Sequence, residues 1–142
     1  NPKAKLTRSI PRRQEIISGF GEDVYEALMV DSDGRILEGL TSNFFAVKMG
    51  ELWTNEGSVL MGITRSVVID TVRDAGLKIN FESVLKEEIS QIQEAFITSA
   101  SRAILPVAQI DDFRIGVGIP GRITHRLMDL LERRIRTEIQ PI

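Results

Sequence analysis

The amino-acid sequence predicts an α+β fold, in which a barrel-like mixed sheet carries helices on its outer side. Short strand-like runs follow one another between residues 24 and 53, and the clearest helical periodicity lies further along, at residues 64–75 and 123–139. Strands mixed with a few helices are typical of α+β domains. The chain shows no repeat, no low-complexity stretch and no internal linker, so we expect its 142 residues to form one domain.

The first half of the chain predicts an antiparallel meander. Strand-like runs occupy residues 24–31, 35–37, 43–48 and 51–53. The segment Asp31-Ser32-Asp33-Gly34 separates the first two runs, because Gly34 adopts a positive φ at low cost. Met49 and Gly50 form a hairpin turn between the last two runs.

The second half mixes helices with short strands. We expect Thr64 to cap the helix over residues 64–75 and Gly76 to end it. The strongest helix spans residues 123–139, where apolar residues form one stripe. The remaining predicted elements are strands at 77–81, 95–98 and 106–110 and a shorter helix at 86–94. Residues 1–13 are polar and basic, and Pro2 and Pro11 interrupt regular structure there.

Charge and hydropathy exclude two classes of partner. The net charge is −2 and the isoelectric point is near 5.5, whereas a nucleic-acid groove needs a basic face. The denser basic spots, Arg12-Arg13 and Arg133-Arg134-Arg136, are expected on solvated faces. No apolar run approaches the roughly 20 residues of a membrane helix, and no signal peptide is visible.

Residue counts also limit the chemistry. The chain has no cysteine, which removes disulfides, thiolate metal sites and cysteine nucleophiles. Its one histidine, His125, lies in a helical pattern and is expected at the surface or in packing. No acidic cluster has the spacing of a calcium loop, so no metal site is predicted.

The segment Gly116-Val117-Gly118-Ile119-Pro120-Gly121 matches the G-x-G-x-x-G pattern of dinucleotide-binding turns. Such a site needs a second strand after the helix, with an acidic residue on that strand for the ribose. Here the chain ends with the helix, and Pro120 stands where the pyrophosphate would be held. We therefore interpret the segment as a glycine-rich connection.

Three other features together favour a phosphorylated cofactor with a ring nitrogen, such as pyridoxal phosphate. Glu38 ends a strand beside a turn, and an ionised carboxylate there can keep a pyridine nitrogen protonated. The turn Gly62-Ile63-Thr64 opens a helix, whose first N–H groups and dipole favour an anion. The stretch Ser99-Ala100-Ser101 adds N–H groups and hydroxyls after a strand. Each feature alone also fits an ordinary strand end, helix start or turn.

The same features resemble the fold-type IV pyridoxal-phosphate enzymes, which include branched-chain aminotransferases, D-amino-acid aminotransferases and aminodeoxychorismate lyase. The resemblance covers nearly the whole chain. It rests on the ordered motifs Glu26-Ala27-Leu28, Glu38-Gly39 with Ser42-Asn43-Phe44-Phe45, Gly62-Ile63-Thr64-Arg65, Phe96 through Pro106-Val107, and Ile115-Gly116 through Gly121. It implies a cofactor-binding C-terminal domain of the D-amino-acid aminotransferase type.

The resemblance assigns roles to individual residues. Lys5 falls at the position of the lysine that forms the Schiff base and shuttles the proton, and Glu38 at that of the carboxylate bound to the pyridine nitrogen. Leu60 matches an apolar residue that packs on the ring. The phosphate would be held by Ile63 and Thr64 and by a second turn, formed by Ser99, Ala100 and Ser101.

Three departures bear on the activity that the resemblance implies. Ile10 stands where branched-chain aminotransferases have a tyrosine, so the pattern leans toward the D-amino-acid or lyase branch. Ala100 stands where many family aminotransferases have threonine, and there backbone N–H groups and the Ser101 hydroxyl would serve instead. The family's smaller N-terminal domain, which supplies an arginine and much of the substrate pocket, is not among residues 1–142. The chain begins with Asn-Pro-Lys, as a piece of a longer protein would.

The leading hypothesis is therefore transamination between an amino acid and a 2-oxo acid. Pyruvate elimination from aminodeoxychorismate, giving 4-aminobenzoate, is the first alternative, and an inactive or dimerising fragment is the second. The resemblance also implies a cytoplasmic homodimer that takes small-molecule substrates.

Overall fold

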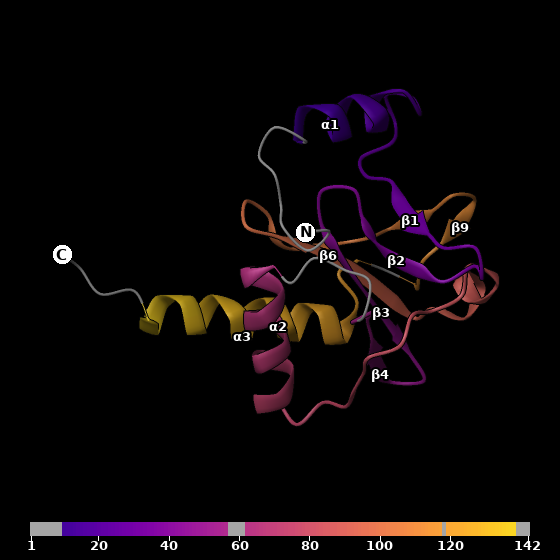
Figure 1. Ribbon diagram of the computed structural model, residues 1–142. Helices are drawn as coiled ribbons and strands as arrows, with labels where there is room; N and C mark the ends of the chain where they lie inside the picture. Colours follow the sequence, from indigo (N-terminus) through magenta and orange to yellow (C-terminus); the bar gives the residue numbers. More distant parts are fainter. Residues whose placement is uncertain (1–9, 57–61, 118, 139–142) are drawn as a thin grey trace.

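The computed structural model describes residues 10–56, 62–117 and 119–138 (Figure 1). In chain order the elements are α1 (Ile10–Ser18), β1 (Leu28–Val30), β2 (Ile36–Gly39), β3 (Asn43–Lys48), β4 (Glu51–Trp53), α2 (Ile63–Asp74), β5 (Ile79–Asn80), the 3₁₀ helix η2 (Lys86–Gln91), β6 (Glu94–Ser99), β7 (Ala103–Pro106), β8 (Gln109–Ile110), β9 (Phe113–Arg114) and α3 (Arg122–Glu138).

Strand β3 is the centre of a seven-stranded sheet. Antiparallel β6 lies along one of its edges, with β2 and β4 on the other, and β7 follows β6. The β4–β5 pair is parallel, so the sheet is mixed, as predicted. Strands β8 and β9 form a separate two-stranded sheet. The α+β class is confirmed, but the pairings among the described residues do not confirm a barrel.

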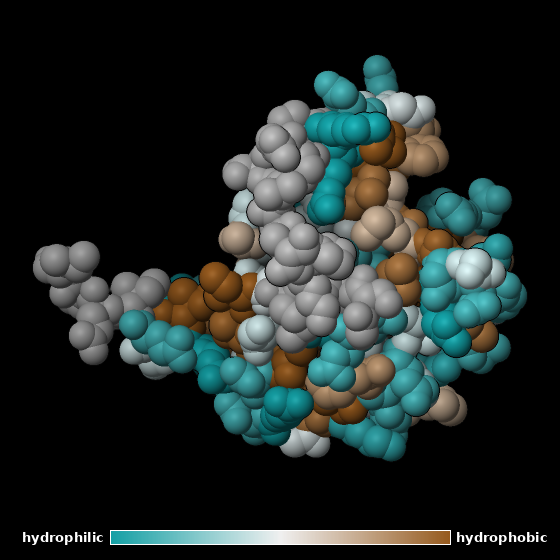
Figure 2. All heavy atoms as spheres, in the orientation of Figure 1, coloured by the Kyte–Doolittle hydropathy of each residue, from teal (hydrophilic) through white to brown (hydrophobic). Residues whose placement is uncertain are grey.

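The sheet is buried on both faces because β3 and β6 carry apolar side chains in both directions. On one face Phe45 stacks on Phe96, with ring centroids 4.9 Å apart, and α2 and α3 cover the pair with Val68, Val72, Leu127 and Leu131. On the other face Phe44, Ala46, Ala95 and Ile97 pack with Ile89 and Ile92. Figure 1 shows α2 and α3 lying together beside the sheet, and Figure 2 shows hydrophobic residues reaching the surface along α3 and beside α1.

The local turn chemistry follows the sequence closely. Met49 and Gly50 have φ values of 53° and 72°, so the predicted hairpin between β3 and β4 is confirmed. Gly76, with φ 71°, follows α2. Helix α3 places Leu127 and Leu131 in the core, as its periodicity predicts. No helix of the described segments is both long and apolar enough to span a bilayer.

Several predicted boundaries were wrong. Residues 106–110 are not one strand, because β7 ends at Pro106 and β8 begins at Gln109. The predicted helix 86–94 is the shorter 3₁₀ helix η2, and Glu94 already belongs to β6. Helix α1 was missed because Pro11 suggested an interruption, yet proline is tolerated in a helix's first turn.

Candidate functional site

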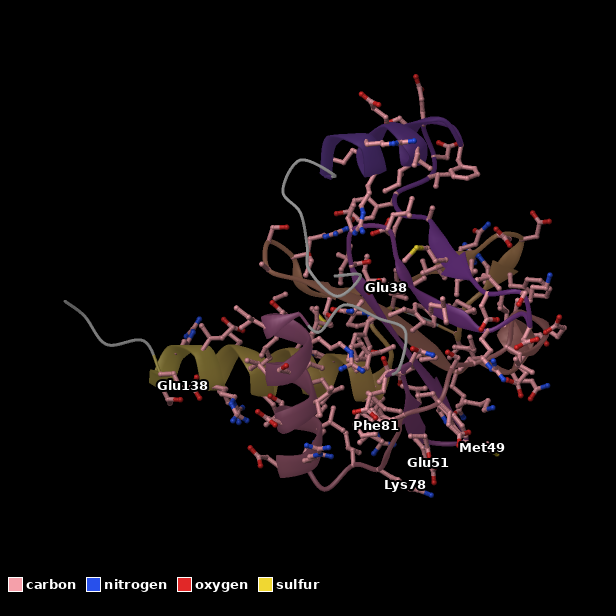
Figure 3. The ribbon with its side chains drawn as sticks, viewed as in Figure 1. Glu38, Met49, Glu51, Lys78, Phe81 and Glu138 are labelled. Atoms are coloured by element: carbon pink, nitrogen blue, oxygen red, sulfur yellow. The ribbon has the colours of Figure 1, made fainter. Side chains whose placement is uncertain are left out.

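A cavity of about 300 Å³ opens where the ends of β2 and β6 meet the start of β3 and of α2. Helix α1 contributes one further lining residue. Figure 3 shows Glu38 lying between α1 and α2, whereas Met49 and Glu51 lie at the opposite end of the sheet. The lining residues are Arg13, Glu38, Gly39, Thr41, Ser42, Asn43, Gly62, Ile63, Thr64, Thr98, Ser99 and Ala100.

One polar row of the sheet contributes three of the lining residues. Glu38 on β2 lies opposite Asn43 on β3, which lies opposite Thr98 on β6, so the three side chains share one face. Asn43 Nδ2 donates to Glu38 Oε2 at 3.1 Å, and Glu38 is only 8% exposed. The Thr98 hydroxyl is buried and has no hydrogen-bond partner in the described structure. A buried hydroxyl in this state is suited to a ligand.

A fully buried arginine lies near this row. Arg65 on α2 is 0% exposed, and its Nη2 donates to the carbonyl oxygen of Asn55 at 2.7 Å. Burial lowers the pKa of Arg65, and the carboxylates of Glu56 and Glu38 oppose that effect. The Glu38 carboxylate therefore favours the charged form of the buried guanidinium.

The start of α2 forms another part of the lining. Gly62 is the N-cap, with φ −70° and ψ 147°, and as a glycine it has no side chain with which to cap the helix, so the prediction of Thr64 as the cap was wrong. The first turn also lacks acidic residues. First-turn N–H groups have no partner within a helix, and the dipole makes this end positive. The N–H groups of Ile63 and Thr64 are therefore suited to an anion.

Gly62 is required by close packing. A Cβ at this position would lie 2.9 Å from Asn43 Oδ1, closer than side chains approach one another. The glycine thus lets the helix start lie directly against the amide that donates to Glu38.

Only two of the three residues in the second predicted phosphate turn, Ser99–Ser101, lie at the cavity. Ser99 and Ala100 line the cavity, whereas Ser101 is exposed and does not. Arg102 Nε donates to Ser99 Oγ at 2.8 Å and so fixes that side chain. Lys5 and Leu60 lie outside the described residues.

Two residues near the cavity have roles that the sequence did not indicate. Arg13 was expected on a solvated face, but it is half-buried; it lines the cavity, and its Nη1 donates to the carbonyl oxygen of Leu40 at 2.7 Å. Glu26, whose side chain is 7% exposed, accepts from the backbone N–H and hydroxyl of Thr41 and from the Ser42 hydroxyl. The Glu26-Ala27-Leu28 motif was a signal for this residue, but nothing in it revealed the partners.

The G-x-G-x-x-G segment has a packing role at the sheet end of α3. A Cβ at Gly116 would meet the Gln93 carbonyl oxygen, and one at Gly121 would meet the Glu94 carboxylate. That carboxylate accepts from the N–H groups of Ile123 and Thr124 at 2.9 and 2.7 Å and thus caps α3. A protein side chain therefore occupies the helix start at which a dinucleotide phosphate would have to bind.

The arrangement of a buried carboxylate and a glycine-led helix start in one cavity agrees with the comparison with known families. The family described as amino-transferase class IV matches residues 21–110. The chain belongs to the class IV aminotransferase family. The match spans both the Glu38 strand and the helix start.

Curated relatives include enzymes acting on different amino acids. A branched-chain-amino-acid aminotransferase of Pseudomonas aeruginosa is 35% identical over 115 residues, which cover 80% of this chain and 36% of the relative. A D-alanine aminotransferase of Bacillus licheniformis is 34% identical over 116 residues, covering 80% and 41%. The chain thus spans about two-fifths of the length of these relatives. Both are aminotransferases, which does not favour the lyase alternative.

Solved structures show the same fold. The branched-chain aminotransferase of Thermobaculum terrenum in its PLP form has a TM-score of 0.85 at 29% identity, covering 97% of this chain and 46% of that one. The branched-chain aminotransferase of the thermophilic archaeon Thermoproteus uzoniensis, solved with norvaline, has a TM-score of 0.84 at 27% identity, covering 98% of this chain and 47% of that one.

Proposed function

We propose that this chain is the pyridoxal-phosphate-binding part of an aminotransferase that moves an amino group between an amino acid and a 2-oxo acid. The observation that carries the proposal is the shared cavity, in which the buried Glu38 carboxylate and the start of α2, whose N-cap is a glycine, both line the wall. The family and the PLP form of a solved relative support the choice of cofactor.

The residues present fit pyridoxal phosphate. The cavity has a volume of about 300 Å³, which is the lower end of the range usual for small-molecule sites, so it suits a cofactor of this size. A pyridine nitrogen needs a carboxylate partner, and Glu38 supplies one; a phosphate needs N–H and O–H donors, and Ile63, Thr64 and Ser99 offer both kinds. The partnerless hydroxyl of Thr98 adds one more donor inside the cavity.

The chemistry divides between the cofactor and the chain. When bound, pyridoxal phosphate supplies an electron sink for negative charge at the substrate's α-carbon. Glu38 would hold a proton on the ring nitrogen, and Asn43 would orient Glu38 through the 3.1 Å hydrogen bond. The first N–H groups of α2 and the turn at Ser99 and Ala100 would bind the phosphate.

The other predicted site residues complete this proposal. Lys5 would be the amine that attaches the cofactor and carries the proton at its Nζ atom, and Leu60 would pack on the ring. Ser101 would assist the phosphate turn from outside the cavity lining. We also propose that residues 1–142 form a C-terminal domain, and that a preceding domain and a second subunit complete the substrate pocket in a cytoplasmic homodimer. The further domain is supported by relatives that are about twice as long as this chain or longer.

Absorbance spectroscopy followed by activity measurement tests the proposal. Titration with pyridoxal phosphate should produce a new near-visible band, and borohydride should fix the cofactor to Lys5, as identified by peptide mass. The longest available form of the protein should then transfer an amino group from D-alanine, L-leucine or L-glutamate to a 2-oxo acid. Absence of the band would refute the binding of pyridoxal phosphate. Attachment of the cofactor to another lysine, with the Lys5→Ala variant still reacting, would refute the role of Lys5.

A further inference from the structure

Arg102, in the turn after β6, is held from several sides. Its Nη2 donates to both the carbonyl oxygen and the hydroxyl of Thr41, at 3.0 and 2.7 Å, while its Nε donates to Ser99 Oγ. Its Nη1 lies 3.9 Å from Glu26 Oε2, and the guanidinium lies over the Tyr25 ring, 5.6 Å from the centroid. The side chain is 18% exposed. Arg102 thus joins the turn after β2 to the turn after β6 in a fixed geometry.

The direction of each hydrogen bond follows from the chemistry of the partners. A guanidinium only donates and an ionised carboxylate only accepts, whereas a hydroxyl has one proton to donate. The Thr41 hydroxyl accepts from Arg102 and donates to Glu26 Oε2 at 2.6 Å. The Ser42 hydroxyl donates to the same carboxylate oxygen at 2.9 Å. Both protons therefore point away from any ligand, although both residues line the cavity.

The Ser99 hydroxyl differs from those of Thr41 and Ser42, because its proton is not donated to Glu26. Its oxygen accepts from Arg102 Nε at 2.8 Å, so the proton stays available. No atom in the described ranges accepts that proton, and Ser99 lines the cavity. A hydroxyl whose oxygen is bound to a cation is also a stronger donor, because hydrogen bonds in a chain polarise one another.

We propose that Arg102 is a positioning residue that commits the Ser99 hydroxyl to donate to the phosphate of the cofactor. The inference rests on the proposed function, because it takes the phosphate to lie at this turn. Arg102 itself would not touch the phosphate, since its guanidinium is already occupied by Thr41, Ser99 and Glu26. Its effect on binding would pass through Ser99.

The test compares the affinities of Arg102→Met for pyridoxal phosphate and for pyridoxal, which lacks the phosphate. We expect affinity for pyridoxal phosphate, measured by the absorbance titration, to fall roughly 10- to 100-fold, the usual range for one hydrogen bond in a charged network. Affinity for pyridoxal should be unchanged. Arg133→Met, which removes an exposed arginine of α3, is the matched control and should change neither affinity.

A double-mutant cycle with Ser99→Ala separates positioning from general damage. If Arg102 acts through Ser99, then Ser99→Ala should weaken pyridoxal-phosphate binding in the wild type and cost almost nothing further in the Arg102→Met background. Arg102→Lys keeps the charge but cannot reproduce the planar guanidinium, so its affinity for pyridoxal phosphate should lie between those of the wild type and Arg102→Met. The cycle is repeated in the lysine background if the methionine variant melts early.

The outcomes are distinct. Losses that add in the cycle, equal losses for pyridoxal and pyridoxal phosphate, or an unchanged affinity of Arg102→Met for pyridoxal phosphate would each overturn the role of Arg102. A wild-type protein that binds no pyridoxal phosphate would instead overturn the proposed function on which the role depends.

Discussion

Replacing Glu38 by glutamine removes one charge from the cavity while keeping its shape. Glutamine has the same length, and its carbonyl oxygen can still accept from Asn43 Nδ2, as the Glu38 oxygen does at 3.1 Å. The change therefore isolates the carboxylate's charge from its packing. In the proposed site this charge holds the proton on the pyridine nitrogen.

The change has two consequences that can be compared, a loss of cofactor affinity and a loss of folding stability. Loss of one charge-assisted hydrogen bond costs about 1.5–3 kcal/mol, so pyridoxal-phosphate affinity should fall roughly 10- to 100-fold. The free energy of unfolding should fall by less than this. Arg65 keeps the carboxylate of Glu56, which supports the charge of Arg65 more strongly than Glu38 does. A charge pair in a partly screened interior is then worth on the order of 1 kcal/mol.

Absorbance titration and urea denaturation measure these two effects in the same samples. Glu56→Gln is the matched control, because it removes the other carboxylate near Arg65 from an exposed position that does not line the cavity. It should lower the free energy of unfolding at least as much as Glu38→Gln, because Glu56 supports the charge of Arg65 more strongly, and leave cofactor affinity unchanged. Equal affinities for the wild type and Glu38→Gln, or equal affinity losses in both variants, would refute the assignment of Glu38.

Three further predictions concern the structure around the site. Gly62→Ala should weaken pyridoxal-phosphate binding in the same titration, because the added methyl would lie 2.9 Å from Asn43 Oδ1 and displace that amide; unchanged affinity would contradict this packing. Glu94→Ala should lower the urea-derived free energy of unfolding by about 2–3 kcal/mol through loss of the α3 cap, and Glu94→Gln by less. The hydrogen bond from the Leu85 backbone N–H, together with Lys48, lowers the pKa of Glu88. The stability that Glu88 contributes should therefore be full above about pH 4.3, the pKa of an unfolded glutamate, and be lost as the pH falls through the lowered folded-state pKa. Glu88→Gln should flatten this part of the stability profile, and an unchanged profile would exclude the role.

The elements predicted best are those fixed by local chemistry. Strands β3 and β4 and the turn at Met49 and Gly50 follow from apolar runs around a pair of residues with positive φ. The end of α2 follows from Gly76 in the same way. Such signals need no information about distant parts of the chain, and the structure confirms them.

The errors arise where a distant partner decides the structure. Glu94 belongs to β6 because β3 pairs with it, whereas its sequence continues a helical pattern. Thr64 is a good N-cap by composition, but the close approach of Gly62 to Asn43 places the helix start two residues earlier. Local preference is weak compared with such tertiary contacts.

The candidate site shows the same division. Glu38, the Ile63–Thr64 helix start and Ser99 were predicted from motifs, and the structure brings them into one cavity. Arg13, Glu26 and Arg102 could not be predicted, since each is held in place by a residue 15 or more positions away: Arg13 by Leu40, and both Glu26 and Arg102 by Thr41. A single sequence carries no record of those pairings.

The charges of the cavity argue for a ligand with opposite charges at its two ends. Buried ions contribute little to stability, because desolvation offsets their attraction, and apolar residues would pack as well. Glu38 and Arg65 are nonetheless both buried, and the positive start of α2 lines the cavity together with Glu38. The first turn of α2 contains no acidic residue, and Asn43 Nδ2 donates to Glu38 Oε2. A ligand with a protonated ring nitrogen and a phosphate would place each of its charges against a group of opposite sign, the nitrogen against Glu38 and the phosphate against the start of α2, which a neutral or singly charged ligand would not.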